Sequence, residues 1–381
     1  MNPGLVVKLR PTGPWRVGPD SGARNRVDSI YHSDALYGAV TSAMLKMGLL
    51  EEWLDATARN VQAPAVTFSS CFPFLDAIGF VVPPRSIWPP QGGSPLVATK
   101  VRWKSARFIP LGLVSALLAG QVLDEEHWTV DGLSECLLPV GRPGPFRAAL
   151  RGNAAVDRLS GATERHSTAC IDFRQGAGLW AVVSFAGEAE RERWSGRVRS
   201  AIRLLADSGF GGERSRGWGH AQAPEFIDGI LPDMILPPTA PVDVAPAPAP
   251  EQSPEAAPAA GAESASVESR AAESNPAEIP VPVETAPTPY WLLSLLAPGA
   301  ADTIDWKRGN YTVIARGGRV DSPAGSGALK KQLSMVAEGS VLYAGEPIRG
   351  SAVNVAPDGF AHPVFRVGFA VSIPLSGQGI S

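Results

Sequence analysis

The run SGFGGERSRGWGH, residues 208–220, carries five glycines and the basic stretch Arg214, Ser215, Arg216. Glycine adopts backbone angles that other residues avoid, and it lets a backbone N–H approach a bulky anion closely. Arginine adds fixed charge and a forked set of donors that suits phosphate. The run therefore predicts a tight cationic loop that holds an anionic ligand. The alternative is a plain turn that caps a helix, for which one glycine would suffice.

A helix is expected directly before this loop and a strand directly after it. In residues 190–207, Trp194, Val198, Ile202 and Leu205 recur at the spacing of one helix face, and the other face is rich in arginine. Residues 221–227 have the pattern of a strand. In phosphate loops of nucleotide enzymes the strand comes first, and a Walker lysine or GxGxxG spacing marks the loop. This order and the missing motifs argue against a nucleotide-binding fold.

The composition divides the chain at residues 237–289. This stretch is mostly Pro, Ala, Glu and Ser and has no aromatic residue, so it cannot bury enough apolar surface to fold. We expect a disordered linker between domains at 1–236 and 290–381. The linker holds eight carboxylates and one arginine, a net of −7, which leaves +4 for the remainder of a chain whose total is −3. A modest positive charge fits nucleic-acid binding along one face.

The cysteines and the N-terminal sequence indicate the compartment. Cys71, Cys136 and Cys170 are odd in number and far apart, which matches neither a zinc site nor a disulfide framework and suits a reducing cytoplasm. The first residues lack the apolar run of a signal peptide, and no stretch approaches the length that spans a bilayer. We expect a cytoplasmic protein without cofactor or metal.

The first part of the chain has the order of a ferredoxin-like βαββαβ unit. Residues 5–9 alternate as a strand, a basic Gly/Pro loop follows, and residues 31–48 carry a buried helical stripe with Ser33 and Asp34 where an N-cap belongs. Residues 147–168 change from alternation to polar residues and back to the apolar run 179–185, which predicts a protruding hairpin. Its arginines could follow a nucleic-acid backbone, although an ordinary solvated hairpin is the alternative.

The second part predicts a smaller α+β module. Residues 290–298 and 311–320 have the pattern of strands, residues 328–337 fit a strand or a short helix, and residues 362–375 alternate. Glycine turns are expected at Gly317, Gly318 and Gly350.

With these pieces in order, the chain resembles the RAMP-family subunits of type III-A (Csm) CRISPR effector complexes, and most of all the fourth Csm subunit, which binds the 5′ handle of the guide RNA. The glycine loop SGFGGERSRGWG at 208–219 is the most specific part of the match. Four weaker matches lie in family order: HSDALYGAVTSAMLKMG at 32–48, CFPF at 71–74, GSVLYAGEPIRG at 339–350 and HPVFRVGFA at 362–370.

The resemblance implies an α+β protein of two ferredoxin-like (RRM-like) domains, the first with a β-hairpin thumb. It implies that the chain grips the crRNA 5′ handle, and that it contacts the large polymerase-like subunit on one side and a backbone RAMP subunit on the other. Carried over by position, the RNA-binding residues are His32, Ser33, Asp34, Arg151, Arg158, Gly209, Gly211, Gly212, Arg214, Ser215, Arg216, Gly217 and Trp218. Trp218, and less so Trp15, could stack on a base, although a tryptophan in such a loop more often packs inward.

A non-catalytic RNA-binding subunit is the first interpretation. The second is a metal-independent repeat endoribonuclease with His32 or His220 as acid or base, because some RAMP relatives cut RNA with histidine. The sequence shows no second partner for such chemistry and no cluster with metal-ligand spacing. The third interpretation is a structural adaptor that makes protein contacts alone.

Overall fold

The computed structural model describes residues 2–18, 23–60, 62–90, 103–237, 287–322 and 324–376. The expected linker, apart from its first residue and last three, lies outside the described residues. The domain boundaries at 236 and 290 therefore stay a prediction.

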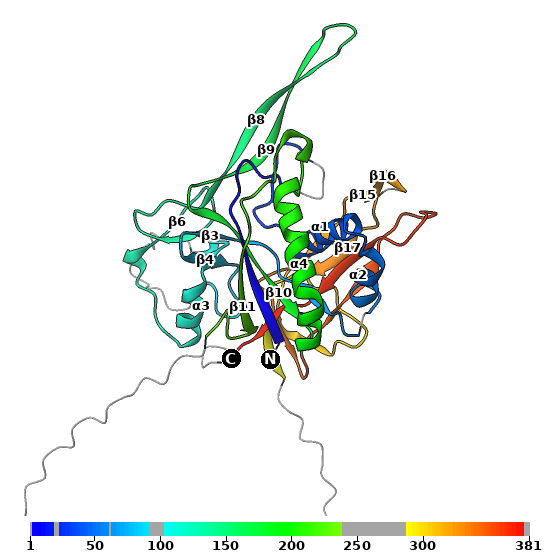
Figure 1. The fold of residues 1–381 in the computed structure, drawn as a ribbon. Coiled ribbons are helices and arrows are strands. Elements are labelled where there is room, and N and C mark those ends of the chain that lie inside the picture. The colour runs from blue at the N-terminus through cyan, green and yellow to red at the C-terminus, as the bar shows by residue number, and fades with distance from the viewer. Residues whose placement is uncertain are drawn as a thin grey trace, which may run out of the picture. The chain divides into compact units, whose positions relative to one another are not determined.

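An antiparallel sheet organises the first part of the chain (Figure 1). Its strand order is β11-β1-β10-β3-β4-β5, and β2 also pairs with β10. The alternating apolar residues of β1 place Leu5, Val7 and Leu9 on its buried face, and β10 is buried along its whole length because it pairs on both sides. The strands are β1 (Asn2–Leu9), β2 (Val66–Phe68), β3 (Phe72–Leu75), β4 (Ile78–Val81), β5 (Ile109–Pro110), β10 (Ala177–Phe185) and β11 (Glu225–Leu231).

Two long helices follow β1 and β10 in the chain. Helix α1 (Ser33–Lys46) and helix α4 (Glu188–Ser208) pack against each other, and α4 also packs on β1 and β10. The stripe predicted from spacing is confirmed, because Trp194, Val198, Ile202 and Leu205 are all buried. Helix α1 begins after His32 rather than after the predicted Ser33 or Asp34. Shorter helical elements are α2 (Leu50–Ala56), α3 (Leu111–Leu118), η1 (Trp103–Ser105) and η2 (Glu125–His127).

The predicted hairpin is present and projects from the sheet (Figure 1). Strands β8 (Phe146–Val156) and β9 (Thr163–Phe173) pair in register from Phe146 opposite Phe173 to Val156 opposite Thr163. A second, short hairpin is formed by β6 (Trp128–Val130) and β7 (Leu137–Pro139).

The second part of the chain is built from antiparallel strands. A four-stranded sheet has the order β13-β18-β12-β21, from β12 (Thr288–Leu292), β13 (Ile304–Asn310), β18 (Val341–Ala344) and β21 (Ser372–Pro374). Three antiparallel pairs complete it: β14 (Val313–Arg316) with β17 (Leu333–Val336), β15 (Arg319–Ser322) with β16 (Gly325–Leu329), and β19 (Gly350–Asn354) with β20 (Phe365–Phe369). A helix was expected in this part as the α component of an α+β module, and that prediction was wrong, because residues 287–322 and 324–376 contain no helix. Residues 328–337, which fitted either a strand or a short helix, contribute to β16 and form β17.

Both parts share one hydrophobic core. Trp291 and Leu293 of the second part are fully buried in the cluster that includes the main sheet, and the Trp291 indole donates to the Val82 carbonyl at 3.1 Å. Helix α1 also packs on β20. Residues 1–237 and 287–381 accordingly form one compact unit.

Candidate nucleic-acid interface

The glycine loop lies between α4 and β11, where the sequence places it. It begins at Gly209 with φ +74°, contains the short helix η3 (Arg214–Arg216), and returns through Gly217 and Gly219, whose φ values are +76° and +83°. At Gly219 the backbone of Phe210 leaves no space for a side chain, and at Gly211 the Arg16 carbonyl lies 2.7 Å from where a Cβ would be. These positions require glycine, so the loop is more than a helix cap.

The loop is held against the first basic loop of the chain. The Gly212 N–H donates to the Arg16 carbonyl at 2.9 Å, and the Gly219 N–H donates to the Pro14 carbonyl at 3.0 Å. The buried Arg16 side chain in turn donates to the Ala169 carbonyl at the base of the hairpin, at 2.7 Å. Three segments that are distant in sequence thus fix the shape of the loop.

The two tryptophans considered as stacking platforms are buried. Trp15 is 1% exposed, donates its indole N–H to the His220 carbonyl, and packs edge-on against Phe210 at 4.5 Å between ring centroids. Trp218 is 8% exposed. The inward-packing alternative therefore describes both residues, because a base cannot stack on a ring that the protein already covers.

The three polar residues of η3 are exposed. Arg214 pairs with Asp321 of β15 at 3.2 Å, and Arg216 pairs with Glu213 at 2.9 Å and lies 3.5 Å from the His166 ring of the hairpin. The carboxylates of Asp321 and Glu213 are at least partly exposed, so water screens both pairs. These two ion pairs therefore contribute little to the stability of the loop.

Next to the loop is a cleft of about 320 Å³ between α1, the end of α4 and the second part of the chain. Its charged lining consists of five cations and two carboxylates: Lys46, Arg214, Arg316, Lys330 and Arg366 against Asp34 and Asp321. An excess of positive charge in a concave site raises the local concentration of anions. Sequence reasoning missed Lys46, Arg316, Lys330 and Arg366, because folding brings them to the loop from other elements.

His32, Ser33 and Asp34 lie inside the protein rather than on an open helix end, with exposures of 3%, 5% and 8%. Ser33 accepts the Leu295 N–H at 3.0 Å, and its own N–H donates to the Ser70 hydroxyl at 2.8 Å. Free N–H groups at this helix start were expected to favour phosphate, but all three residues are buried and the Ser33 N–H already has a protein partner. They join the two parts of the chain instead.

The Asp34 carboxylate is bound by two buried arginines of the second part. Arg316 donates to both carboxylate oxygens, at 2.9 and 3.1 Å, and Arg366 also donates to Oδ2. Burial would raise the pKa of the Asp34 carboxyl, but the two guanidinium groups hold that pKa below its ordinary value. Asp34 is therefore charged and fixes both arginines at the floor of the cleft.

The His32 imidazole lies between two carboxylates. Nδ1 is 2.7 Å from Glu338, Nε2 is 3.1 Å from Asp28, and the Ser70 hydroxyl also donates to Glu338. Burial lowers the pKa of His32, but Glu338 and Asp28 outweigh it and raise that pKa to about 9. The same imidazolium helps to lower the pKa values of Asp28 and Glu338 despite their burial. His32 is thus protonated and enclosed near neutral pH, which argues against a role as acid or base on RNA.

The free energy of unfolding is expected to fall by about 3 kcal/mol as the pH rises from 6.5 toward 9, because the folded state keeps a proton on His32 that the unfolded chain releases. Below pH 6.5 both states bind the proton and the stabilisation is complete. Towards acid, stability is lost as the three carboxylates with lowered pKa values take up protons.

Urea unfolding at several pH values from 4 to 8.5 measures this dependence of stability on pH. His127→Gln is the control, since this exposed histidine pairs only with Asp124; a flat profile above pH 6.5 would contradict the assignment.

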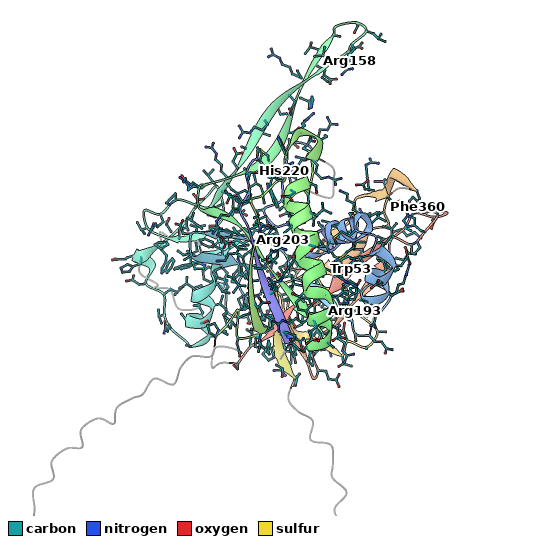
Figure 2. The ribbon with its side chains drawn as sticks, in the orientation of Figure 1. Trp53, Arg158, Arg193, Arg203, His220 and Phe360 are labelled. Atoms are coloured by element: carbon teal, nitrogen blue, oxygen red, sulfur yellow. The ribbon has the colours of Figure 1, made fainter. Side chains whose placement is uncertain are left out.

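The hairpin places its predicted residues apart from the cleft. Arg151 lies on β8 and forms a two-pronged pair with Asp172 at 2.8 Å. Arg158 lies in the turn at the far end of the hairpin (Figure 2). The structure therefore brings together Gly209, Gly211, Arg214 and the cleft, while Arg151 and Arg158 belong to a separate surface.

The arginines of α4 are largely neutralised by neighbouring carboxylates. Arg193 and Arg197 both pair with Glu52 of α2, and Arg199 pairs with Asp228 of β11. Figure 2 shows Arg193 at the end of α4 away from the hairpin. This face holds α4 against its neighbours.

Neither metal nor thiol chemistry is indicated in the described part of the chain. Its residues contain no group of three His, Cys, Asp or Glu side chains that could hold a metal ion. The three cysteines are buried, and burial raises the pKa values of Cys71 and Cys136 to about 12, so both thiols stay protonated. None of the helices in the described ranges is long and apolar enough to cross a membrane.

Comparison with protein families gives a match in the second part of the chain. Residues 286–375 match the family model of the CRISPR Csm4 C-terminal domain. These residues are similar to the C-terminal domain of Csm4 proteins. The resemblance seen in the sequence, to a RAMP-family subunit of type III-A (Csm) complexes, is thereby confirmed. No curated protein matches the sequence significantly.

Solved structures share the fold along the whole chain. A chain of the "Csm3-Csm4 subcomplex in the type III-A CRISPR-Cas interference complex" matches with a TM-score of 0.57 at 13% identity, over 98% of this chain and 99% of that one. A chain of the "Csm1-Csm4 cassette in complex with cA4" matches with a TM-score of 0.52 at 16% identity, over 98% of both chains. These matches support a mixed α/β fold with antiparallel sheets, which agrees with the predicted α+β class.

Proposed function

We propose that this chain is a non-catalytic RNA-binding subunit of a type III CRISPR interference complex. It holds the 5′ handle of the crRNA and bridges the large polymerase-like subunit to the backbone RAMP subunits. The observation that carries the RNA-binding role is the cationic cleft beside the glycine loop, because phosphates need convergent fixed charge and a backbone that can approach them. The bridging role is supported by the fold shared with chains of the Csm3-Csm4 and Csm1-Csm4 structures.

The main sheet supplies the platform for this role. Its strands β11-β1-β10-β3, with α1 after β1 and α4 after β10, have the order of a ferredoxin-like βαββαβ unit. We extend the proposal to this unit as the first of two ferredoxin-like domains, with β8 and β9 as its thumb. The loop between α4 and β11 then lies where the final helix of the unit meets its last strand.

The affinity for a 5′-handle RNA is expected to fall steeply with salt, and Arg214→Ala with Arg216→Ala should weaken it roughly tenfold or more and reduce the slope of log K against log salt by about 2. The physical reason is that each phosphate neutralised by an arginine releases counterions. Fluorescence anisotropy with the RNA that copurifies with the chain, in sodium chloride from low to moderate concentration, measures both quantities.

The matched control for this test is Arg193→Ala with Arg197→Ala, which removes the same charge from α4, where both side chains pair with Glu52. That control should bind RNA as the unchanged protein does. A salt-independent affinity, or equal losses in both double variants, would favour the adaptor that makes protein contacts alone. Specific cleavage of the RNA in the presence of chelator would favour the endoribonuclease, with His220 as the remaining candidate.

A further inference from the structure

An exposed aromatic pair lies at the edge of the second sheet, with Trp306 on β13 and Tyr311 directly after that strand, before β14 begins at Val313. Trp306 and Tyr311 are 38% and 41% exposed, and their rings pack edge to face with centroids 5.2 Å apart at 73°. Val313, two residues further, is 52% exposed. Exposed aromatic side chains that brace one another are typical of the anchors that carry most of the energy in protein interfaces. We define Trp306, Lys307, Arg308, Tyr311 and Val313 as the β13 patch.

The backbone of β13 leaves the sheet at this patch. Pairing with β18 holds at Asp305 opposite Tyr343 and resumes at Asn310 opposite Val341, so four residues of β13 face one of β18. Such a bulge presents side chains and breaks the even row of backbone donors and acceptors that an added strand would need. A partner therefore engages the side chains of the patch rather than extending the sheet.

The charge of the β13 patch is positive. Lys307 and Arg308 are exposed, and no carboxylate among the described residues forms an ion pair with either of them. The Arg308 guanidinium is held in place over the Tyr343 ring, 4.4 Å from its centroid. Asp305, next to them, accepts the Lys307 backbone N–H at 3.1 Å. One held cation and one exposed lysine beside aromatic side chains complement a partner surface that presents carboxylates.

The same features favour a protein over RNA as the occupant. In an edge-to-face pair one ring covers the face of the other, whereas bases stack along a series of open faces. The excess charge is also smaller here than in the cleft, where five cations face two carboxylates. We propose that the β13 patch is the docking surface for an acidic region of a protein neighbour, an inference that rests on the bridging role within the proposed function.

The test uses the full chain with the purified large polymerase-like subunit and the purified backbone RAMP subunit of the same complex. Affinity for each is measured by biolayer interferometry, and affinity for the 5′-handle RNA in parallel. Trp306→Ala should weaken binding to one of the two proteins roughly tenfold or more. Lys307→Glu, which removes no packing, should weaken the same complex and flatten its salt dependence. RNA affinity should be unchanged in both variants.

The control is Leu329→Ala, which removes an apolar side chain that is 65% exposed from β16, outside the patch. If Trp306→Ala and Lys307→Glu lower RNA affinity and leave both protein complexes intact, the patch is an RNA platform and the inference is wrong. If both proteins bind the unchanged chain and the variants alike, the inference alone fails. If neither protein binds the unchanged chain, the bridging role fails and the inference with it.

Discussion

Asp34→Asn is expected to lower the free energy of unfolding by about 3–5 kcal/mol, because removing one partner of a buried ion pair leaves the other charges uncompensated. The carboxylate is almost completely buried and pairs with both Arg316 and Arg366, which come from two strands of the second part of the chain. Asparagine keeps the size of the side chain but not its charge, so the two guanidinium groups would face each other in a site of low polarity. Urea unfolding followed by circular dichroism measures the loss.

The matched control for Asp34→Asn is Asp358→Asn. Asp358 pairs with Lys331 at 2.6 Å, but its side chain is 93% exposed, so water screens the pair and its loss should matter little. A loss for Asp34→Asn as small as that of the control would show that the buried network is not needed for folding.

Gly219→Ala is expected to destabilise the protein by about 3–4 kcal/mol, the sum of a left-handed backbone and an unavoidable overlap. Gly219 has φ +83°, and a Cβ there would collide with the Phe210 carbonyl and lie 3.0 Å from the Phe210 nitrogen. Backbone atoms cannot rotate away as a side chain can. The two ends of the loop, at Phe210 and Gly219, would have to move apart. This movement would also disturb the hydrogen bond from the Phe210 N–H to the Gly219 carbonyl.

Gly217→Ala separates the two causes. Gly217 has a similar φ of +76°, but nothing lies within 4 Å of a Cβ built there, so the cost is that of the backbone conformation alone, about 1–2 kcal/mol. Thermal unfolding of both variants should rank Gly219→Ala as clearly the less stable. Equal losses would mean that the loop can move away from Phe210 and is not held as tightly as its contacts indicate.

Local patterns predicted the elements of the first part well, because each pattern reports on its own segment. The period of Trp194, Val198, Ile202 and Leu205 located α4, and the alternation around Arg147 located the hairpin. The same reasoning failed where partners come from distant segments. Asp34 has the sequence signature of a helix start, and only the fold brings the Arg316 and Arg366 guanidinium groups to it.

For the same reason, the sequence predicted the loop of the candidate site but not the cleft beside it. The glycines and arginines of residues 209–217 lie together in sequence, so their loop was recognised before folding. The cleft beside it depends on Lys46, Lys330 and Arg366, which no spacing rule connects. The tryptophans were ambiguous because the same residue type serves as anchor and as platform; burial decided that Trp15 and Trp218 are anchors.

The shared core has a consequence for how this protein is made. His32 pairs with Asp28 of the first part and with Glu338, which lies 306 positions further along, so the network around the imidazolium stays incomplete until the second part has left the ribosome. Contacts between such distant positions form late and slow the final step of folding. During synthesis the unfinished sheet would therefore display apolar surface, a state in which chains aggregate unless a chaperone shields them.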